Sequence, residues 1–220
     1  MLNFRDTDEC RTYITSDTHL NHNPKWDIPI WKSRGYNSAV EMTDKIIDNI
    51  NKIVRPNDNL IHVGDLCLNT PPHQFASLIS RINCQNIYLQ PGNHSNPQHK
   101  GIYIPLVKQL LGENYTENSE VYPLRYRNII FVAPYMEVTL NGNFAALFHY
   151  PISVWNHIKE SSWCLCGHSH HNYPPTQVQS TSGKILDVGV DGHNYMPWSI
   201  PEIVAAMSKK QFIPPGDHHQ

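Results

Sequence analysis

The 220-residue chain lacks the features that mark several large classes of protein. Charged residues make up only 16% of it, and a formal net charge of −2 leaves no basic footprint for general nucleic-acid binding. No run approaches the ~20 apolar residues of a membrane-spanning helix. The segment from Met1 to Glu9 is acidic and has no apolar signal core. We therefore expect a cytoplasmic protein without a membrane partner.

Cysteine is also scarce. The chain has five cysteines, and an odd number in a chain without a secretion signal argues against a disulfide framework. Cys164 and Cys166 are separated by a single residue, whereas zinc knuckles place roughly two to four residues between their cysteines. We interpret the cysteines as buried free thiols.

Histidine, by contrast, is abundant, with 14 copies. His218 and His219 lie in a proline-rich polar tail, residues 214–220, which we expect to be flexible. Most of the other histidines fall in short motifs with Asp, Asn and Gly, which calls for a chemical explanation. Residues 1–213 have the length and the apolar content of a single domain.

Hydrophobic periodicity predicts alternating strands and helices in the first half of the chain, with Ser38 as a helix N-cap and Glu41 as its capping-box partner. The expected strands cover 11–16, 59–63 and 86–90, and the expected helices cover 40–54, 72–82 and 102–111. This alternation is typical of parallel βαβ units and predicts an α/β fold.

The second half is richer in strand patterns. Strands are expected at 121–124, 128–133, 137–140, 143–148, 162–166 and 183–188, followed by a helix at 201–209. Asn141-Gly142 is a strong hairpin signal between two of these strands. We expect this half to be mostly antiparallel.

Five short polar motifs occur in a fixed order along the chain. They are Asp17-Thr18-His19, Gly64-Asp65, Gly92-Asn93-His94, His149 and Gly167-His168-Ser169-His170. Four of them directly follow predicted strands, and open α/β sheets bind ligands at the carboxyl ends of their strands. Residues two apart on an extended segment point to the same side, so Asp17 and His19 can reach one ion. The same holds for His168 and His170, where Gly167 permits a close backbone approach.

Carboxylate, imidazole and carboxamide groups suit divalent ions such as Mn²⁺, Zn²⁺ or Fe²⁺. The seven candidate ligands are Asp17, His19, Asp65, Asn93, His149, His168 and His170. They are too many for one tetrahedral zinc and fit two ions that share a carboxylate. Each motif alone could be an ordinary turn or a helix-entry loop, but their ordered occurrence at strand ends favours metal binding.

The ordered motifs resemble the five-block pattern of the calcineurin-like metallophosphoesterases over residues 13–191. The segments 16–22 and 187–191 are most similar to small bacterial and phage members. The resemblance implies a four-layer α/β/β/α sandwich, in which two mixed sheets pack face to face with helices outside. It also implies two divalent ions, with Mn²⁺ the first choice and Zn²⁺, Fe²⁺ or Ni²⁺ as alternatives.

The resemblance further implies how the ligands divide. The first ion would be held by Asp17, His19, Asp65 and His170, and the second by Asp65, Asn93, His149 and His168. Asp65 would bridge the two ions, and His94 would lie beside them as a general acid. Such ions, ~4 Å apart, acidify a bridging water whose hydroxide attacks phosphorus. Proton transfer to the leaving group by His94 would contribute ~10²–10⁴-fold.

The sequence departs from the family pattern at Ser95, where the family usually has Asp or Glu. Either His94 acts without a charged partner, or another carboxylate such as Asp191 takes that place. Asp65 is followed by Leu66 and Cys67, which argues against a Ser/Thr protein phosphatase.

Several residues near the first motif are candidates for substrate contact. His22, Asn23 and Arg34 could bind the substrate directly, and Trp26 and Trp31 could stack on a base or simply anchor their loop. His62, inside a predicted strand, is interpreted as a core histidine.

The leading hypothesis is a dinuclear-metal phosphoesterase that hydrolyses phosphate diesters, or monoesters, of a small or nucleotide-like substrate. One alternative is a nuclease acting on DNA or RNA, which the missing basic surface disfavours. Another is a non-catalytic scaffold of the same fold. Such a scaffold should have lost metal ligands, and all seven are present.

Overall fold

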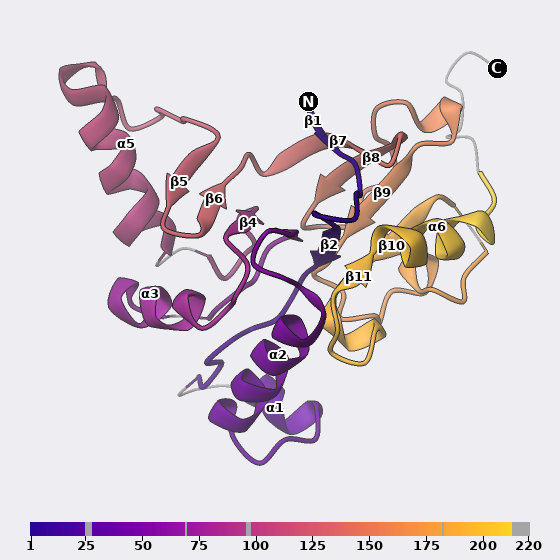
Figure 1. Cartoon of the computed structure of the whole chain (residues 1–220), viewed down its shortest axis with the longest axis horizontal. Helices are drawn as coiled ribbons and strands as arrows, with labels where there is room; N and C mark the ends of the chain where they lie inside the picture. The colour runs from indigo at the N-terminus through magenta and orange to yellow at the C-terminus, as the bar shows by residue number, and fades with distance from the viewer. Residues whose placement is uncertain (25–27, 69, 96–97, 182, 213–220) are drawn as a thin grey trace.

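The computed structural model describes residues 1–24, 28–68, 70–95, 98–181 and 183–212, and two mixed β-sheets flanked by helices form its body (Figure 1). The predicted fold class is therefore confirmed. The expected flexible tail at 214–220 lies outside the described residues. None of the described helices has both the length and the apolar character to cross a membrane.

The first sheet has six strands in the order β11-β2-β3-β4-β6-β5. Their bounds are β2 (Thr12–Thr15), β3 (Asn59–His62), β4 (Asn86–Leu89), β5 (Leu124–Tyr126), β6 (Ile129–Phe131) and β11 (Trp198–Ser199). Strands β2, β3, β4 and β6 are parallel, and β5 and β11 pair antiparallel at the two edges. The predicted βαβ alternation is thus confirmed, although the strand expected at 121–124 begins only at Leu124.

The crossover helices match their predicted positions. They are α2 (Ala39–Ile53), α3 (Pro72–Ser80) and α5 (Ile104–Leu111), and α5 is preceded by a π-helical turn at His99–Tyr103. The Ser38 hydroxyl caps α2 by accepting a hydrogen bond from the backbone N–H of Glu41 at 3.0 Å. The Glu41 carboxylate accepts from the backbone N–H of Asn37 at 2.8 Å, so the predicted capping box is shifted by one residue on this side.

The second sheet has five strands in the order β1-β7-β8-β9-β10. Their bounds are β1 (Leu2–Phe4), β7 (Tyr135–Leu140), β8 (Asn143–Phe148), β9 (Trp163–Cys166) and β10 (Ile185–Asp187). The hairpin at Asn141 and Gly142 joins β7 to β8, and both residues have the positive φ (48° and 86°) that a tight hairpin turn needs.

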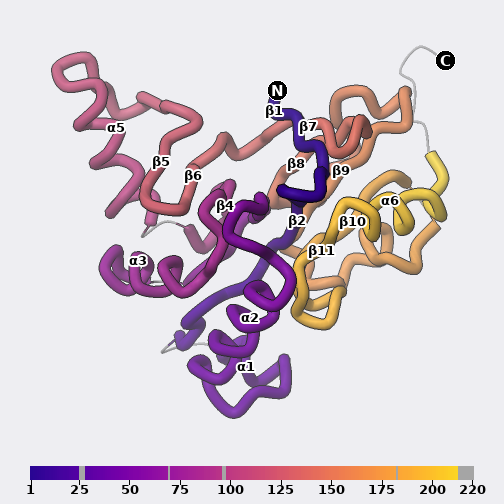
Figure 2. The backbone as a smooth tube through the Cα atoms, viewed as in Figure 1, coloured from indigo at the N-terminus to yellow at the C-terminus, as the bar shows by residue number. Residues whose placement is uncertain are grey.

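The prediction that this half is mostly antiparallel was wrong. Only β7 and β8 pair antiparallel in the second sheet, whereas β1–β7, β8–β9 and β9–β10 are parallel. Figure 2 shows the course of the chain through these strands. Parallel neighbours need long crossovers. Here the crossovers are the segments 149–162 and 167–184, which contain short 3₁₀ turns and no α-helix among the described residues. Because the sequences of these two segments lack helical periodicity, they do not indicate that the strands on either side are parallel.

Three further elements have too few residues to give a pattern and were not predicted. They are β1, β11 and the helix α1 (Ile30–Ser33). The last helix, α6 (Ile200–Ser208), lies one residue before its predicted position and begins at a capping box between Ser199 and Glu202.

The two faces of each strand supply different parts of the core. Ile14 and Ile61 of the first sheet join Leu147 and Leu165 of the second in one fully buried cluster, which fixes the sheets face to face. The residues that precede Ile14 and Ile61 point to the opposite face of the first sheet, where they pack with the helices in a second cluster. Its members include Tyr13, Leu60, Ile46, Ile50, Phe75 and Val107.

The outer face of the second sheet packs against the crossover 149–162. Trp155 and Ile158 cover Ala146 and Cys164 there. All five cysteines are free, as predicted, and Cys67, Cys84, Cys164 and Cys166 are buried whereas Cys10 is partly exposed. Because apolar side chains cover the faces of both sheets, the polar side chains lie together at the strand ends.

Candidate metal centre

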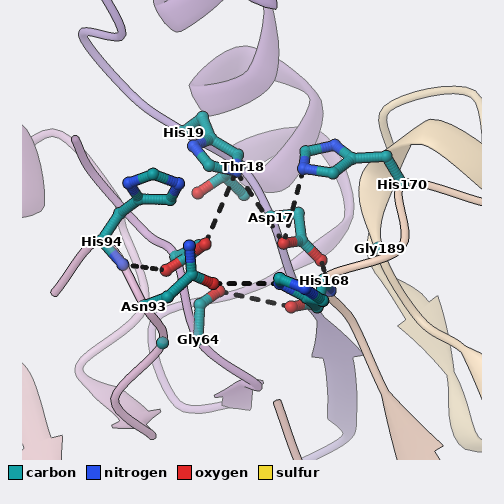
Figure 3. Close-up of polar contacts among 12 residues, drawn as sticks. Asp17, Thr18, His19, Gly64, Asn93, His94, His168, His170 and Gly189 are labelled. Atoms are coloured by element: carbon teal, nitrogen blue, oxygen red, sulfur yellow. Dashed lines mark hydrogen bonds and ion pairs between the residues drawn. The ribbon is translucent and has the colours of Figure 1, made fainter. Parts of the chain in front are cut away.

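The five polar motifs meet where strands of both sheets end. The loops that follow β2, β3 and β4 come from the first sheet, and those that follow β8 and β9 come from the second. Figure 3 shows the side chains of His19, His94, Asn93, His168 and His170 directed toward one another around Asp17. The structure therefore brings all seven predicted ligands together.

The backbone at these ligands is turned and not extended, contrary to the prediction. φ is 55° at Asp17, 47° at His19, 56° at Asp65, 67° at His168 and 47° at His170. Such left-handed values are uncommon for residues other than glycine, and they cluster where a site over-determines the chain. Asp17 and His19 therefore converge through a tight loop, and the neighbouring strand-end loop fixes that loop. The backbone N–H groups of Asp17 and His19 donate to the carbonyls of Gly64 and Asp65 at 3.1 and 3.0 Å.

The first half-site consists of Asp17, His19, Asp65 and His170. Nε2 of His19 lies 3.8 Å from Oδ1 of Asp17 and 3.8 Å from Oδ2 of Asp65, and Nε2 of His170 lies 3.9 Å from Oδ1 of Asp17. These distances exceed a hydrogen bond. Two ligands that are each ~2.1 Å from one ion are at most ~4.2 Å apart, so the spacing fits a shared divalent ion.

Three buried polar atoms of this half-site have no hydrogen-bond partner. They are Oδ1 of Asp17 and both ring nitrogens of His19. Burial raises the pKa of Asp17 to about 6. Burial, together with the positive charge of His170 and Arg34, lowers the pKa of His19 well below its usual value, so its ring is neutral with a free lone pair. Unpaired buried polar atoms are costly, and a cation would satisfy two of the three, Oδ1 of Asp17 and the lone pair of one His19 nitrogen.

The second half-site consists of Asp65, Asn93, His149 and His168. Nδ1 of His149 lies 2.8 Å from the carbonyl of Val63, which can only accept, so Nδ1 carries the proton. Nε2 of His149 then faces Oδ1 of Asn93 at 2.9 Å and Oδ2 of Asp65 at 3.3 Å. Burial disfavours the charged ring, but the Asp65 carboxylate raises the pKa of His149 above its usual value. A proton or a cation is therefore required between these atoms.

His168 joins the cluster through Asn93. Its Nδ1 lies 3.0 Å from Oδ1 of Asn93, and its backbone N–H donates to Oδ2 of Asp17 at 2.9 Å. A separation of ~3.0 Å is what two neighbouring ligands of an octahedral ion would have. Asp17, Asp65 and His149 also form a ligand group in which one ligand atom from each residue lies within 4.8 Å of the other two.

Asp65 occupies the position between the half-sites. Its Oδ2 faces both His19 and His149, whereas its Oδ1 accepts from the backbone N–H of His94 at 2.9 Å. Burial would raise the pKa of Asp65, but the His149 ring and the His94 N–H hold it below the usual value. The geometry fits a bridging carboxylate.

Two glycines allow the loops to approach this closely. A Cβ at Gly167 would overlap Oγ of Ser16 and Oδ2 of Asp17, which confirms the predicted need for close approach at this position. A Cβ at Gly64, where φ is 94°, would overlap the His149 ring.

The His94 ring lies next to the His19 ring, with centroids 5.3 Å apart. Oγ of Ser95 accepts from the backbone N–H of Gly92 at 2.8 Å and supports the loop, not His94. The suggestion that Asp191 replaces the missing carboxylate was wrong, because Asp191 contacts Nδ1 of His170 at 2.8 Å. Among the described residues, no carboxylate forms an ion pair with the His94 ring.

Sequence reasoning missed the role of two acidic residues. Asp187 is buried and accepts from the Ser169 hydroxyl, the backbone N–H of His171 and the backbone N–H of Gly189, which fixes the loop that carries His168 and His170. Asp191 supports His170 directly. The motif 187–191 was visible in the sequence, but spacing alone did not indicate these partners.

The predicted substrate residues are placed differently from one another. His22 is buried, and its Nδ1 accepts from the backbone N–H of Ile30, whereas Asn23 is exposed. Trp31 lies in α1 and is partly buried against the helical core, whereas Trp26 lies outside the described residues. Arg34 is buried among protein acceptors.

His62 is a core histidine, as predicted. Its ring is fully buried, and burial lowers its pKa to about 3. The Thr18 hydroxyl donates to the carbonyl of Leu66 and accepts from Nε2 of His62 at 3.0 Å, which ties β3 to the first motif.

Comparison with known proteins agrees with this arrangement. The family model for calcineurin-like phosphoesterases matches residues 10–172. An uncharacterized protein of Methanocaldococcus jannaschii, MJ1445, is 25% identical over 208 residues, which cover 92% of this chain and 94% of that protein. The crystal structure of AQ665 from Aquifex aeolicus, a protein of unknown function, has a similar fold. It superposes with a TM-score of 0.55 at 19% identity, over 89% of this chain and 98% of that one.

Proposed function

The chain belongs to the calcineurin-like phosphoesterases, a family of metal-dependent phosphoester hydrolases, and on this premise we propose that it is a dinuclear-metal phosphodiesterase acting on a small or nucleotide-like substrate. The observation that carries the proposal is the position of Asp65. One oxygen of its carboxylate faces an imidazole of each half-site, at 3.8 Å from His19 and 3.3 Å from His149. A single carboxylate shared in this way suits two ions better than one.

The seven residues of the half-sites would hold the ions. Mn²⁺ is our first choice, because the donors mix carboxylate and carboxamide oxygen with imidazole nitrogen and include no thiolate. Bound divalent ions would supply Lewis acidity that polarises the phosphoryl oxygens and acidifies water.

His94 is the proposed proton donor to the leaving oxygen. Its backbone N–H is held by Asp65 at 2.9 Å, and its partly buried ring lies against His19 at the edge of the first half-site. It is thus close to the reacting centre and outside the ligand set. A positioned acid of this kind contributes ~10²–10⁴-fold to the rate.

An exposed aromatic ring beside the second half-site supports a substrate with a base or an aryl group. Tyr150 is 39% exposed, and its ring centroid lies 4.6 Å from that of His168 and 5.1 Å from that of His149. Stacking on such a ring is worth ~1–3 kcal/mol per base. The net charge of −2 favours a small ligand over a long nucleic acid.

The proposal is tested by metal content together with substrate preference. We expect two ions per purified chain and Mn²⁺-dependent hydrolysis of bis-p-nitrophenyl phosphate that exceeds hydrolysis of p-nitrophenyl phosphate. A preference for the monoester would contradict a diesterase. A chain that holds two ions but hydrolyses neither ester would be a scaffold.

A further inference from the structure

Arg34 is a buried guanidinium whose hydrogen bonds are all made within the protein. Its Nε and Nη2 donate to the two carboxylate oxygens of Asp191 at 2.7 and 2.6 Å. Nη2 also donates to the carbonyl of Asp17 at 2.7 Å, and Nη1 donates to the carbonyl of Thr18 at 3.1 Å and contacts the sulfur of Met42 at 3.6 Å. Because a guanidinium has five N–H groups, none is left for a substrate. The predicted substrate contact by Arg34 is therefore wrong.

These bonds join the two segments of the first half-site. Asp17 and His19 follow β2, whereas His170 follows β9 in the other sheet. The Arg34 side chain holds the first segment by its carbonyls and the second through Asp191, whose Oδ2 lies 2.8 Å from Nδ1 of His170. A carboxylate can only accept, so Nδ1 of His170 carries the proton and the lone pair of Nε2 points toward Asp17.

The second half-site has a different support. The free ring nitrogen of His149 is set by the backbone carbonyl of Val63, a group that no substitution of a side chain removes. Among the described residues, Arg34 and Asp191 make no hydrogen bond to Asn93, His149 or His168. The bonds of Arg34 and Asp191 thus reach the first half-site directly, whereas the second half-site is joined to the first through the bond from the His168 N–H to Asp17 and through the shared Asp65.

We propose that Arg34 is a positioning residue which, through Asp191 and the carbonyls of residues 17 and 18, sets the affinity of the first half-site for its ion and leaves the second half-site unaffected. The proposal rests on the proposed dinuclear function. Partners of metal-bound imidazoles of this kind typically change metal affinity by ~10–100-fold when they are removed. Lysine would keep the charge but not the planar fork that serves Asp191 and both carbonyls at once.

The test is a Mn²⁺ titration of the metal-free chain by calorimetry, with the spin coupling of the bound Mn²⁺ pair followed by electron paramagnetic resonance. Wild type should show two binding events and a coupled pair. Arg34→Gln and the shape-conserving Asp191→Asn should each weaken one event by ~10–100-fold and keep the other unchanged. The affinity of Arg34→Lys for this ion should lie between that of wild type and that of Arg34→Gln. At saturating Mn²⁺ the KM for bis-p-nitrophenyl phosphate should stay at the wild-type value.

Arg55→Gln is the matched control, since it breaks an Arg–Asp pair, with Asp58, that contacts none of the ligands. It should bind both ions as wild type does. Folded Arg34 and Asp191 variants that keep both affinities, or lose both equally, would overturn the proposal. So would a raised KM with unchanged metal binding, the result expected for a substrate contact. If Arg34→Gln does not fold, Asp191→Asn and Arg34→Lys decide the question. A wild-type chain that binds only one ion would overturn the dinuclear function itself.

Discussion

Oδ2 of Asp65 lies 3.3 Å from Nε2 of His149, and the two residues come from different sheets. Asp65 follows β3 in the six-stranded sheet, and His149 follows β8 in the five-stranded sheet. Ions held between them would therefore connect the two layers of the fold. Metal binding should stabilise the folded chain as well as activate it, because a ligand that binds only the native state adds to its stability.

Asp65→Asn should remove both ions and all activity, because the shared carboxylate loses its charge. With Mn²⁺ at ~100 times its dissociation constant, wild type should gain ~2.7 kcal/mol per site in unfolding free energy, and the variant should gain almost none. Thermal unfolding with and without a chelator measures the difference. A variant stabilised by Mn²⁺ as much as wild type would contradict a bridging role.

His94→Ala should keep both ions and lose turnover by ~10²–10⁴-fold on esters with an alkoxide leaving group. The loss should be much smaller with p-nitrophenolate, which leaves readily without a proton. Metal content is the control. Equal metal loss in the His94 and Asp65 variants would mean that His94 has no separate role in proton transfer.

Much of the site could be predicted from the sequence, because two features coincide at each ligand: a β-pattern ends, and a residue that can bind a metal follows. The β-pattern marks where a strand stops, and Asp17, Asp65 and His149 follow within three residues of the ends of β2, β3 and β8. The parallel order of β2, β3 and β4 then brings the loops that carry Asp17, Asp65 and Asn93 to one edge of the first sheet. Residue type and position thus agree without any knowledge of distant contacts.

The support around the ligands could not be predicted, because it depends on long-range pairing and local backbone strain. Arg34 and Asp191 are 157 residues apart, and no periodicity connects them. The positive φ of Asp17 and His19 is imposed by the adjacent loop, so an extended geometry was the natural but wrong expectation. The parallel pairs of the second sheet were missed because their crossovers lack helices.

Gly64→Ala should abolish binding at the second half-site, since a Cβ there would overlap the His149 ring. Gly35→Ala separates this effect from backbone strain. Gly35 also has a positive φ, 78°, but a Cβ there would meet nothing within 4 Å. Both variants should lose ~1–2 kcal/mol from the left-handed backbone. Only Gly64→Ala should change the Mn²⁺ titration, and a similar change in Gly35→Ala would contradict the steric explanation.

Tyr150→Ala should raise the KM for aryl or nucleotide diesters by about 5–150-fold, the equivalent of ~1–3 kcal/mol of stacking, with kcat little changed. Tyr150→Phe keeps the ring and should behave as wild type. An alkyl phosphodiester without a ring is the control substrate, and its KM should be the same for all three proteins. An equal rise with that substrate would show that Tyr150 acts on the site and not on the aromatic group.

Asp58 should make the stability of the chain depend on pH. Its buried carboxylate accepts from the backbone N–H of Arg11 at 2.8 Å and from both the backbone and the side chain of Arg55. Burial would raise the pKa of Asp58, but these hydrogen bonds and the Arg55 charge hold it below the usual value. A carboxyl group with a lowered folded pKa stabilises the protein above its unfolded pKa of ~3.9, and this stabilisation is lost as pH falls through the folded pKa.

Asp58→Asn should therefore cost about 1.5–3 kcal/mol of unfolding free energy at pH 7, the range for hydrogen bonds to a charged group. The difference from wild type should shrink once the pH falls below ~4, where the carboxyl protonates in the unfolded and then in the folded chain. Urea unfolding between pH 7 and pH 3, in the presence of a chelator, measures it. Asp44→Asn breaks the Asp44–Arg81 pair, in which both side chains are about half exposed, and should change stability by less than ~1 kcal/mol. A cost for Asp58→Asn that is independent of pH would show that packing, and not the carboxylate charge, stabilises this turn.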